Sequence, residues 1–417
     1  MNKVSIITLG CKQNKYESDC MARILQDFGY DVTEELVCAD IYILNTCAVT
    51  AEAEKKSRQH IIKFNKLNPQ CKIIICGCAS EKNREQFVDK PNVKVVFGTE
   101  GKEKILEYVQ GALSESIPIS RIYAGPVKPI KSTTREYVKI QDGCNNFCSY
   151  CIIPYLRGRS RSRDLDDIIK ECEIIASRSH EIVLTGIDIS SYSIDGKLAL
   201  DVLMERLSKI PALIRLGSLE IGVITERFLK VLSQISNFAP HFHLSLQSGD
   251  DEILKLMNRH YTSNEFYEKV LLIRKYFPDC NLTTDVIVGF GNETEKQFEN
   301  TKEFIKKVGF SFVHIFPYSR RAGTRAYAFP DLTMAIKKQR VDELEEVNSV
   351  LKKQFLEKFI GRESTVIIEE KKEYFEGFSP EYIRCYTNEI VNCGHKYRIR
   401  FDSIYDNGMK VKVIKEL

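Results

Sequence analysis

Short apolar stretches alternate with segments of helical periodicity over the first part of the chain. This alternation is typical of a parallel sheet whose strands are joined by crossover helices. We therefore expect residues 1–115 to form a Rossmann-like parallel α/β domain. Its strands are expected at Val4–Leu9, Ile41–Leu44 and Lys72–Cys76, and its helices at Glu17–Phe28 and Ala53–Leu67.

A second alternating series begins at Tyr137 and contains six strand–helix units. Six units predict a partial (β/α)6 barrel over residues 130–360, because the closed barrel of this type has eight. The strands are expected at Tyr137–Ile140, Glu181–Leu184, Leu213–Leu216, His241–Leu246, Asn281–Val288 and Phe312–Phe316. The helices are expected at Asp164–Ser177, Leu198–Leu207, Glu226–Ile235, Ser263–Tyr276, Glu295–Lys307 and Met334–Phe359.

The remaining segments differ from both series. Gly111–Thr134 is rich in Pro, Ser and Gly, which indicates a linker with room for one short strand. Over residues 361–417 the helical pattern gives way to short β-rich stretches, which predict a small all-β barrel. Its strands are expected at Val366–Glu369, Tyr382–Cys385, Lys396–Ile399 and Met409–Ile414.

The composition excludes several broad classes of protein. Of the 417 residues, 43% are hydrophobic and 28% are charged, a globular balance that excludes a disordered chain. No apolar run approaches the length of a membrane span, and the N-terminus lacks the apolar core of a signal peptide. We therefore expect a cytoplasmic protein without a membrane partner. The net charge of +4 is too small to indicate a nucleic-acid partner by itself.

A cluster of cysteines carries the clearest chemical signal. The chain has 14 cysteines, and in a reducing compartment such residues bind metal more often than they form disulfides. Cys144, Cys148 and Cys151 follow the first strand of the second series as a C-x3-C-x2-C run. Three thiolates at this spacing suit a cubane iron–sulfur cluster and leave one iron open for a substrate or cofactor. The alternative is a zinc site completed by a distant ligand, although the sequence lacks a second knuckle.

A second set of cysteines is dispersed along the N-terminal domain. Cys11, Cys47 and Cys78 each follow a predicted strand. Because the carboxyl ends of parallel strands share one edge of the sheet, the three thiols are expected to converge and could hold a second cluster. Taken singly, each could equally be a small buried apolar residue. Cys76 lies inside a strand and is expected to pack within the sheet.

Further motifs accompany the two cysteine triads. In chain order they are Leu9-Gly10-Cys11-Lys12-Gln13-Asn14, Glu17-Ser18, Asn45-Thr46-Cys47-Ala48-Val49-Thr50, Gly77-Cys78-Ala79, Pro154–Arg163, Ser245–Gly249 and Phe316–Ser319. Together they resemble the methylthiotransferases of the radical S-adenosylmethionine (SAM) superfamily over essentially the whole chain. The C-terminal β domain is similar to the small RNA-binding TRAM module of the same family.

The residues around Cys11 are most similar to one branch of that family. Lys12, Asn14 and Tyr16 match the branch acting on N6-threonylcarbamoyladenosine at position 37 of tRNA. The alternatives are the branches acting on isopentenyladenosine in tRNA or on an aspartate of a ribosomal protein. Two segments depart from the family pattern and leave the local loop shape open, namely Gly289–Thr294 and Ile221-Gly222.

The resemblance implies two 4Fe–4S clusters and SAM as cofactors. The Cys144/Cys148/Cys151 cluster would bind SAM and cleave it to a 5′-deoxyadenosyl radical. The Cys11/Cys47/Cys78 cluster would hold the sulfur that is methylated and then transferred to carbon 2 of adenine. The implied partners are the tRNA anticodon arm, an electron donor such as flavodoxin or ferredoxin, and a sulfur source. No catalytic residue beyond the cluster ligands is assigned.

Candidate SAM contacts lie where the strands of the second series end. Polar and small residues at this rim could bind the ribose or amino group, although they could also be ordinary residues of a barrel mouth. Gly186 could let the backbone approach SAM closely. The candidates are Thr185, Gly186, Ser218, Glu220, Ser245 and Gln247.

Two features are candidates for RNA binding. Arg157, Arg159, Arg161 and Arg163 alternate, so in an extended segment they would share one face suited to phosphates; the alternative is a solvated loop with salt bridges. The C-terminal domain has as many basic as acidic residues, so its charge does not decide the matter. Its aromatic residues Tyr374, Phe375, Phe378, Tyr382 and Tyr386 could stack on bases or fill a small β core.

Two functions without catalysis remain as alternatives: an iron–sulfur electron carrier and a zinc-stabilised RNA-binding protein. The cluster of an electron carrier is normally ligated by cysteine at every iron. Triads that leave one iron open therefore favour an enzyme.

Overall fold

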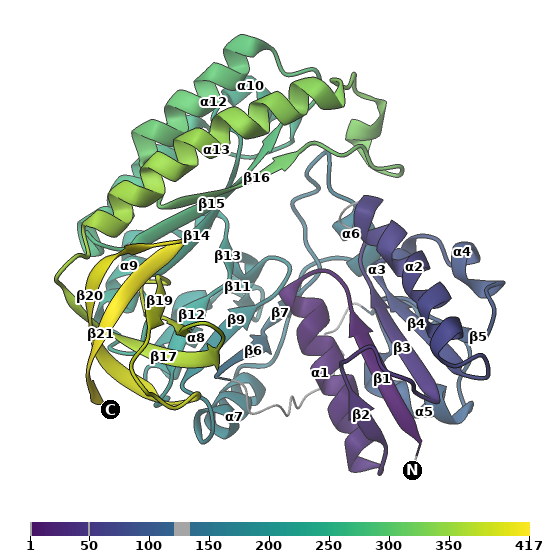
Figure 1. Cartoon of the computed structure of the whole chain (residues 1–417). Coiled ribbons are helices and arrows are strands. Elements are labelled where there is room, and N and C mark those ends of the chain that lie inside the picture. The colour runs from purple at the N-terminus through teal and green to yellow at the C-terminus, as the bar shows by residue number, and fades with distance from the viewer. Residues whose placement is uncertain (1, 49–50, 121–133) are drawn as a thin grey trace.

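A computed structural model describes residues 2–48, 51–120 and 134–417 (Figure 1). Its N-terminal part is a parallel five-stranded sheet with the order β2-β1-β3-β4-β5, covered by helices. The strands are β1 (Lys3–Thr8), β2 (Asp31–Thr33), β3 (Ile41–Thr46), β4 (Lys72–Gly77) and β5 (Val93–Val96). The helices are α1 (Lys12–Asp27), α2 (Ala51–Leu67), α3 (Cys78–Lys82), α4 (Glu85–Val88) and α5 (Ile105–Gln110), with a 3-10 turn at Lys102–Lys104.

The central part is an open barrel of six parallel strand positions. One group pairs as β12-β9-β6 and the other as β13-β14-β15-β16, and Gly217 separates β12 from β13 within a single strand position. The strands are β6 (Arg135–Lys139), β9 (Glu181–Thr185), β12 (Leu213–Leu216), β13 (Ser218–Leu219), β14 (His241–Gln247), β15 (Asn281–Val288) and β16 (Phe312–Pro317). The predicted partial barrel is confirmed.

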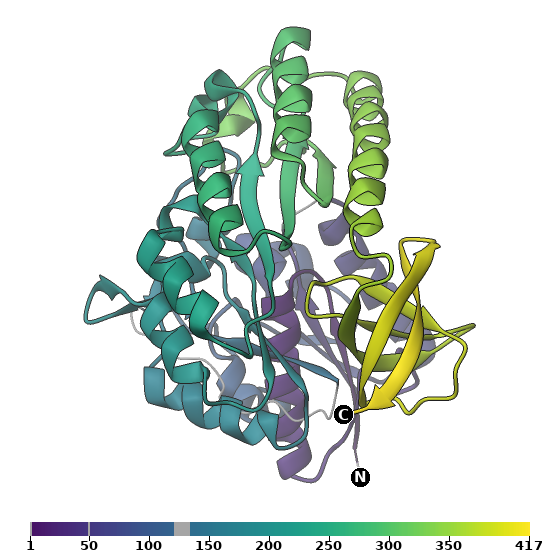
Figure 2. The ribbon, with the colours of Figure 1, turned by 90° about the vertical axis from the view of Figure 1, so that its left-hand side faces the viewer.

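Helices cover the outer face of this barrel (Figure 2). Local sequence explains where they begin: Thr262 and Thr294 form capping boxes with Glu265 and Gln297, and Asp164 accepts hydrogen bonds from the backbone of Asp166 and Asp167. The helices are α7 (Leu165–Ala176), α8 (Leu200–Leu207), α9 (Glu226–Gln234), α11 (Ser263–Tyr276), α12 (Glu295–Val308) and α13 (Met334–Glu357).

Short elements lie outside this regular alternation. They are α6 (Ile153–Arg157), α10 (Asp251–Leu256), β7 (Gln141–Asp142), β8 (Arg161–Ser162) and the β10–β11 hairpin (Ser193–Ile194 and Lys197–Leu198), with 3-10 turns at Ile189–Ser191, Ile221–Val223 and Arg325–Ala328. The predicted linker contains no strand over residues 111–120, and its remainder, residues 121–133, lies outside the described residues. No helix in the described part of the chain has the length and apolar character needed to cross a lipid bilayer.

The C-terminal part is a closed five-stranded barrel with the order β17-β18-β19-β21-β20, as the β-rich pattern predicted. Its strands are β17 (Glu363–Lys371), β18 (Phe375–Phe378), β19 (Arg384–Thr387), β20 (Lys396–Tyr405) and β21 (Gly408–Glu416). The sequence did not predict β18, and it placed the strand at Tyr382–Cys385 two residues too early. Tyr382 instead has a φ of 62°, which is incompatible with an extended strand.

The C-terminal barrel packs against the amino ends of the central strands. Arg135 pairs with Glu369 at 2.7 Å, and Arg215 donates to the backbone carbonyl of Pro380 at 2.9 Å. Tyr382 stacks on His241 with ring centroids 4.8 Å apart. Among the aromatic residues considered for base stacking, Tyr382 is therefore used to dock the barrel.

Candidate active site

Two neighbouring segments hold the Cys144–Cys151 loop in place. The Cys144 amide donates to the Gly158 carbonyl at 3.1 Å, and the Ser149 amide donates to the Met257 carbonyl at 2.9 Å. Gly143 has a φ of 71°, and a Cβ there would lie 2.1 Å from the Arg159 carbonyl oxygen. A side chain at this position would therefore displace the loop that carries the cysteines.

The dispersed cysteines meet at one edge of the N-terminal sheet. Cys11 precedes α1, Cys47 follows β3, and Cys78 is the first residue of α3 directly after β4. At Gly10, where φ is 102°, a Cβ would lie 2.7 Å from Cys47 Sγ, so only glycine lets these two loops approach. Asn14 donates to the Thr46 carbonyl at 3.0 Å and fixes the same approach.

Both triads line a single cavity of about 520 Å³. Its wall contains Cys11, Cys47, Cys78, Cys144, Cys148 and Cys151, together with Thr185, Gly186, Ser218, Glu220 and Gln247 from the strand ends. Cys76 is not among the lining residues; it is fully buried within the apolar packing around β4. The structure thus brings together two sets of thiols that come from different domains.

The chemistry of the donors fits two cubane clusters better than zinc. Each triad offers three sulfurs, and no histidine is among the described residues that line the cavity. Burial raises the pKa of Cys144 and of Cys151 to about 12, so both side chains are neutral thiols without a cluster. Because the ligand is the thiolate, assembly of a cluster here releases protons.

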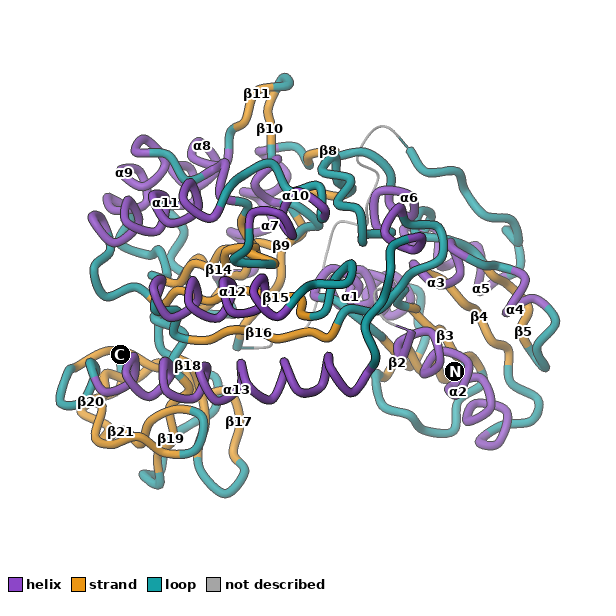
Figure 3. Tube along the Cα trace, turned by 90° about the horizontal axis from the view of Figure 1, so that it is seen from above, coloured by secondary structure: helices purple, strands orange, loops and turns teal. Residues whose placement is uncertain are grey.

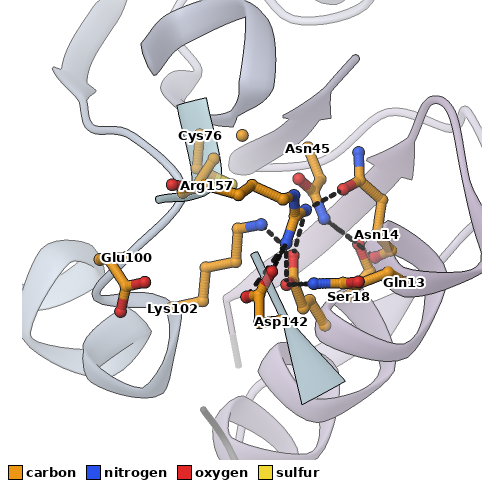
Figure 4. A network of polar contacts seen from close by, with 12 residues as sticks. Gln13, Asn14, Ser18, Asn45, Cys76, Glu100, Lys102, Asp142 and Arg157 are labelled. Carbon is orange, nitrogen blue, oxygen red and sulfur yellow. Dashed lines mark hydrogen bonds and ion pairs between the residues drawn. The ribbon is translucent and has the colours of Figure 1, made fainter. Parts of the chain in front are cut away.

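A buried network of charges joins the N-terminal sheet to the barrel beside this cavity (Figure 4). Arg157, at the end of α6, donates to Glu17 on α1 at 2.8 Å and to Asn14 at 2.7 Å. Lys139 on β6 donates to Glu17 at 2.8 Å and to Asp142 at 2.7 Å, and Lys102 also pairs with Glu17. Although burial disfavours its charge, Glu17 has a pKa held well below its usual range by Arg157, Lys102 and Lys139.

The network places several cations next to one cysteine triad. Its cations include Arg157, Lys102, Lys139 and Arg161, its carboxylates include Glu17, Glu100 and Asp142, and Glu103 also acts on Lys139 and Lys102. Burial raises the pKa of Cys78, and the adjacent Arg157 guanidinium opposes that effect with its charge and a hydrogen bond. A cluster ligated by thiolates would be stabilised by the adjacent Arg157 charge.

The prediction that four alternating arginines face RNA phosphates is wrong for three of them. Arg157 is fully buried, and Arg161 and Arg163 are buried and paired with Glu100 and Glu171. The physical reason is tertiary packing: α1 and the loop after β5 supply partners from the N-terminal domain for Arg157 and Arg161, and α7 supplies Glu171 for Arg163. Only Arg159 is exposed, and its guanidinium lies 4.3 Å from the centre of the Phe147 ring.

Replacing Arg157 by methionine is expected to lower the free energy of unfolding by about 3–5 kcal/mol, because Glu17 and Asp142 would remain buried with fewer partners. Arg159→Met is the matched control, two residues away and exposed, and should change stability by no more than about 0.5 kcal/mol. Urea unfolding of both variants beside the parent protein measures the difference. Equal unfolding midpoints for the two variants would contradict this role of Arg157.

Several lining residues had no recognisable signal in the sequence. Arg259 donates to Cys148 Sγ at 3.3 Å and pairs with Glu220, so it connects a cysteine to a candidate SAM contact. Asp188 is buried in the same wall, and burial together with Glu220 raises its pKa to about 6. Both residues lie in loops whose position only packing decides.

The structure refines the candidate SAM contacts. Ser245 does not line the cavity, and its carbonyl accepts hydrogen bonds from Arg259 and Tyr261. Gly186 lines the cavity, but a Cβ there would meet Gln141 at 2.9 Å, so its lack of a side chain serves packing. Gln247 has a φ of 68°, which is unfavourable outside glycine and marks strain at the cavity wall.

A second, larger cavity of about 860 Å³ adjoins the first. Gly10, Lys12, Gly217 and Ser218 line both cavities. The wall of the second cavity also contains His243, Asp285 and His314 from β14, β15 and β16, together with residues of α13 and the C-terminal barrel. His243 pairs with Asp285 at 3.3 Å. The sequence singled out none of His243, Asp285 and His314.

Comparisons with known proteins agree with this arrangement. Residues 138–305 match the family described as Radical SAM superfamily, and residues 3–98 match Uncharacterized protein family UPF0004. The chain is 36% identical to the threonylcarbamoyladenosine tRNA methylthiotransferase MtaB of Aquifex aeolicus, covering 90% of this chain and 95% of that protein. It is 36% identical to the tRNA-2-methylthio-N(6)-dimethylallyladenosine synthase of Dictyoglomus thermophilum, covering 89% and 88%.

Among solved structures, the fold is similar to that of the radical S-adenosylmethionine methyltransferase TsrM from Kitasatospora setae. The TM-score is 0.58 at 14% identity, and the match covers 78% of this chain and 77% of that protein. At this identity the likeness concerns the fold.

Proposed function

Because the chain belongs to the radical SAM methylthiotransferase family, we propose that it converts N6-threonylcarbamoyladenosine at position 37 of tRNA to its 2-methylthio derivative. The observation that carries this proposal is the meeting of two cysteine triads from separate domains in one cavity. Transfer of sulfur to a base activated by a radical needs both reacting groups in the same enclosed space. The segment around Cys11 and the MtaB relative support the choice of base.

The cofactors of this family are two 4Fe–4S clusters and SAM, which when bound supply a 5′-deoxyadenosyl radical and the methylated sulfur. We propose that Cys144, Cys148 and Cys151 hold one cluster and that Cys11, Cys47 and Cys78 hold the other. The protein itself positions these groups relative to one another. The buried network around Arg157 keeps the two domains, and so the two triads, in a fixed relation.

We further propose that Thr185, Gly186, Ser218, Glu220 and Gln247 contact SAM from the strand ends, because they line the cavity beside Cys144 and Cys148. Asp188 and Arg259 join this set. Arg259 is held by Glu220 and by the Ser245 carbonyl, so its position next to Cys148 does not depend on a ligand.

The experiment that tests this function is analysis of the nucleosides made by the purified, reconstituted protein. It is incubated with SAM, dithionite, sulfide and tRNA that carries threonylcarbamoyladenosine, and the digested tRNA is examined by mass spectrometry. The proposal expects the 2-methylthio derivative of that nucleoside. Product only on isopentenyladenosine tRNA, or only on a ribosomal protein, would keep the family chemistry and overturn the substrate.

We also propose that the C-terminal barrel binds the anticodon arm of tRNA. Its neutral composition hides a cationic face: Arg398 lies opposite Lys415 and Arg400 lies opposite Lys412 on the exposed side of β20 and β21. Like charges directly opposite one another destabilise a sheet, so a binding role for phosphates would explain them. Arg400 and Lys412 have acidic neighbours in Glu363 and Asp402. Exposed Arg159 remains a further candidate.

Changing Arg398 and Lys415 together to glutamate is expected to weaken tRNA binding and to flatten its dependence on salt, since about one counterion is released per phosphate contact. The logarithmic salt slope should fall by about 2 for the double variant. Lys197→Glu is the control, because the β10–β11 hairpin projects from the side opposite the C-terminal barrel (Figure 3). Fluorescence anisotropy with labelled tRNA, repeated over a series of salt concentrations, measures the affinity and the salt slope of both variants. An unchanged slope in the double variant would assign this face another role.

The remaining partners follow from the chemistry. Reductive cleavage of SAM consumes an electron, and each product takes up a sulfur atom. We therefore propose a low-potential donor such as flavodoxin or ferredoxin, a separate sulfur source, and action in the cytoplasm, where tRNA is found. Replacement of dithionite by such a donor in the nucleoside assay tests the first of these, and failure of both carriers to support product would exclude them.

A further inference from the structure

A second cavity lies next to the one that both cysteine triads line. The base must present carbon 2 to the cavity that both cysteine triads line, and N6 lies on a different edge of the purine. A substituent on N6 therefore points away from the cysteines. The neighbouring space is the second cavity of about 860 Å³, because Gly10, Lys12, Gly217 and Ser218 line both.

Lys12 stands at the junction of the two cavities. It is the first residue of α1 and follows Cys11 directly. Its side chain is open to the cavities, and among the described residues it makes no ion pair. No acidic residue lies in the first turn of α1, and a cation at the start of a helix is electrostatically unfavourable. The fold alone therefore does not explain this charge.

The other cations of the second cavity are placed differently. Arg215 pairs with Glu181 at 2.6 Å and donates to backbone carbonyls of the C-terminal barrel, and Arg384 pairs with Glu376. Lys352, on α13, has no ion pair among the described residues, but it lines only the second cavity and lies 5.3 Å from the centre of the Phe312 ring. Among the described residues, Lys12 is therefore the cation at the junction that makes no ion pair, although the charges of Glu181 and Asp285 act on it from a longer distance.

The rest of the wall suits a polar substituent. A ring nitrogen of His243, a ring nitrogen of His314 and a carboxylate oxygen of Asp285 lie within 4.8 Å of one another. The hydroxyl of Thr283 forms a hydrogen bond of 2.9 Å with His243. Together they offer hydrogen-bond donors and an acceptor for a urea group and a hydroxyl. An apolar isopentenyl group could form no hydrogen bond with these side chains.

On this basis we propose that Lys12 pairs with the carboxylate of the threonylcarbamoyl group, and that His243, Asp285 and His314 line the subsite for its urea and hydroxyl. This inference rests on the proposed function, because it presumes that carbon 2 of the adenine faces the cysteines. In this arrangement, Lys12 is the residue by which the protein distinguishes an anionic N6 substituent from a neutral one. The gain comes from a charge-assisted hydrogen bond in a partly desolvated site.

The test measures how the reconstituted enzyme binds two anticodon stem-loop RNAs. One carries threonylcarbamoyladenosine at position 37, and the other carries the methyl ester of its threonine carboxylate, which removes the charge and adds one methyl group. The parent protein is expected to bind the acid about 10–100-fold more tightly than the ester, the range of a charge-assisted hydrogen bond. Lys12→Met should reduce this ratio to about 1, and Lys12→Arg should retain most of it.

Lys352→Met is the matched control, because it removes a lysine from the second cavity that does not reach the first. Any loss of affinity in this variant should be equal for the two RNAs, so the ratio stays at that of the parent. Iron content, measured with SAM cleavage in the absence of RNA, tests whether Lys12→Met keeps both clusters, including the one ligated by the neighbouring Cys11.

The outcomes separate this inference from the proposed function. Conversion of threonylcarbamoyladenosine by the parent protein, with the same acid-to-ester ratio in Lys12→Met, would overturn the role of Lys12 alone. An acid-to-ester ratio of about 1 in the parent protein would do the same. Conversion only of isopentenyladenosine would overturn the substrate and the inference together.

Discussion

Replacement of Cys144, Cys148 or Cys151 by alanine is expected to abolish formation of 5′-deoxyadenosine from SAM in the presence of dithionite. These thiols occupy one loop whose backbone is fixed by Gly158 and Met257, and they supply the ligands of a single cubane. Loss of one thiolate leaves two irons of the cubane without a cysteine ligand, so the cluster should not assemble at full occupancy. Chromatographic detection of 5′-deoxyadenosine and iron analysis give the two readouts.

Cys280→Ala is the control for this series. Cys280 is buried in the same central domain and, like Cys144 and Cys151, has a pKa raised by burial to about 12, but it does not line the cavity. Its variant should keep iron and SAM cleavage. A triple alanine variant of Cys144, Cys148 and Cys151 that still released 5′-deoxyadenosine would refute the assignment of this loop.

Replacement of Cys11, Cys47 or Cys78 by alanine should have a different signature. SAM cleavage is expected to persist, because the other triad is intact, while the methylthiolated nucleoside disappears. Iron content should fall by about half, since each triad holds one cubane. The measurement is the nucleoside assay combined with iron analysis and 5′-deoxyadenosine detection on the same preparation.

Cys76→Ala provides a close control for the second triad. Cys76 lies two residues before Cys78 in the same segment, yet it packs with Val4, Ile6 and Ile74 and does not line the cavity. This variant should retain both iron and product. Full product yield from Cys47→Ala would refute a role for the dispersed cysteines in sulfur transfer.

The different signatures follow from one geometric fact. The two triads belong to separate domains, so a substitution in one triad leaves the cysteines of the other in place. Both triads nevertheless line the same cavity. Arg157 is one direct link, since it comes from the segment after the barrel cysteines and contacts Asn14, Glu17 and Cys78 of the N-terminal domain. Variants at Arg157 are therefore expected to affect both domains, unlike variants of either triad.

Much of the architecture was determined by local sequence. Period-two and period-3.6 patterns placed the six central strands and their helices close to their observed bounds, because each element buries one face against a common core. The convergence of Cys11, Cys47 and Cys78 followed from strand order alone, since parallel strands end at the same edge. The weakest points were short elements such as β18 and α10, which carry little periodicity.

Only the tertiary structure decided the role of the charged residues. The alternation of Arg157, Arg161 and Arg163 is the same whether these side chains face water or face acids, and the acid that meets Arg157 is Glu17, 140 positions away. Lys12 shows the converse: the sequence places its charge at the start of a helix, but only packing puts it where two cavities meet, without an ion pair among the described residues. Sequence specifies which charges exist, whereas burial and the partners that folding brings within a few ångströms decide whether a charge stabilises the fold or remains free to bind a ligand.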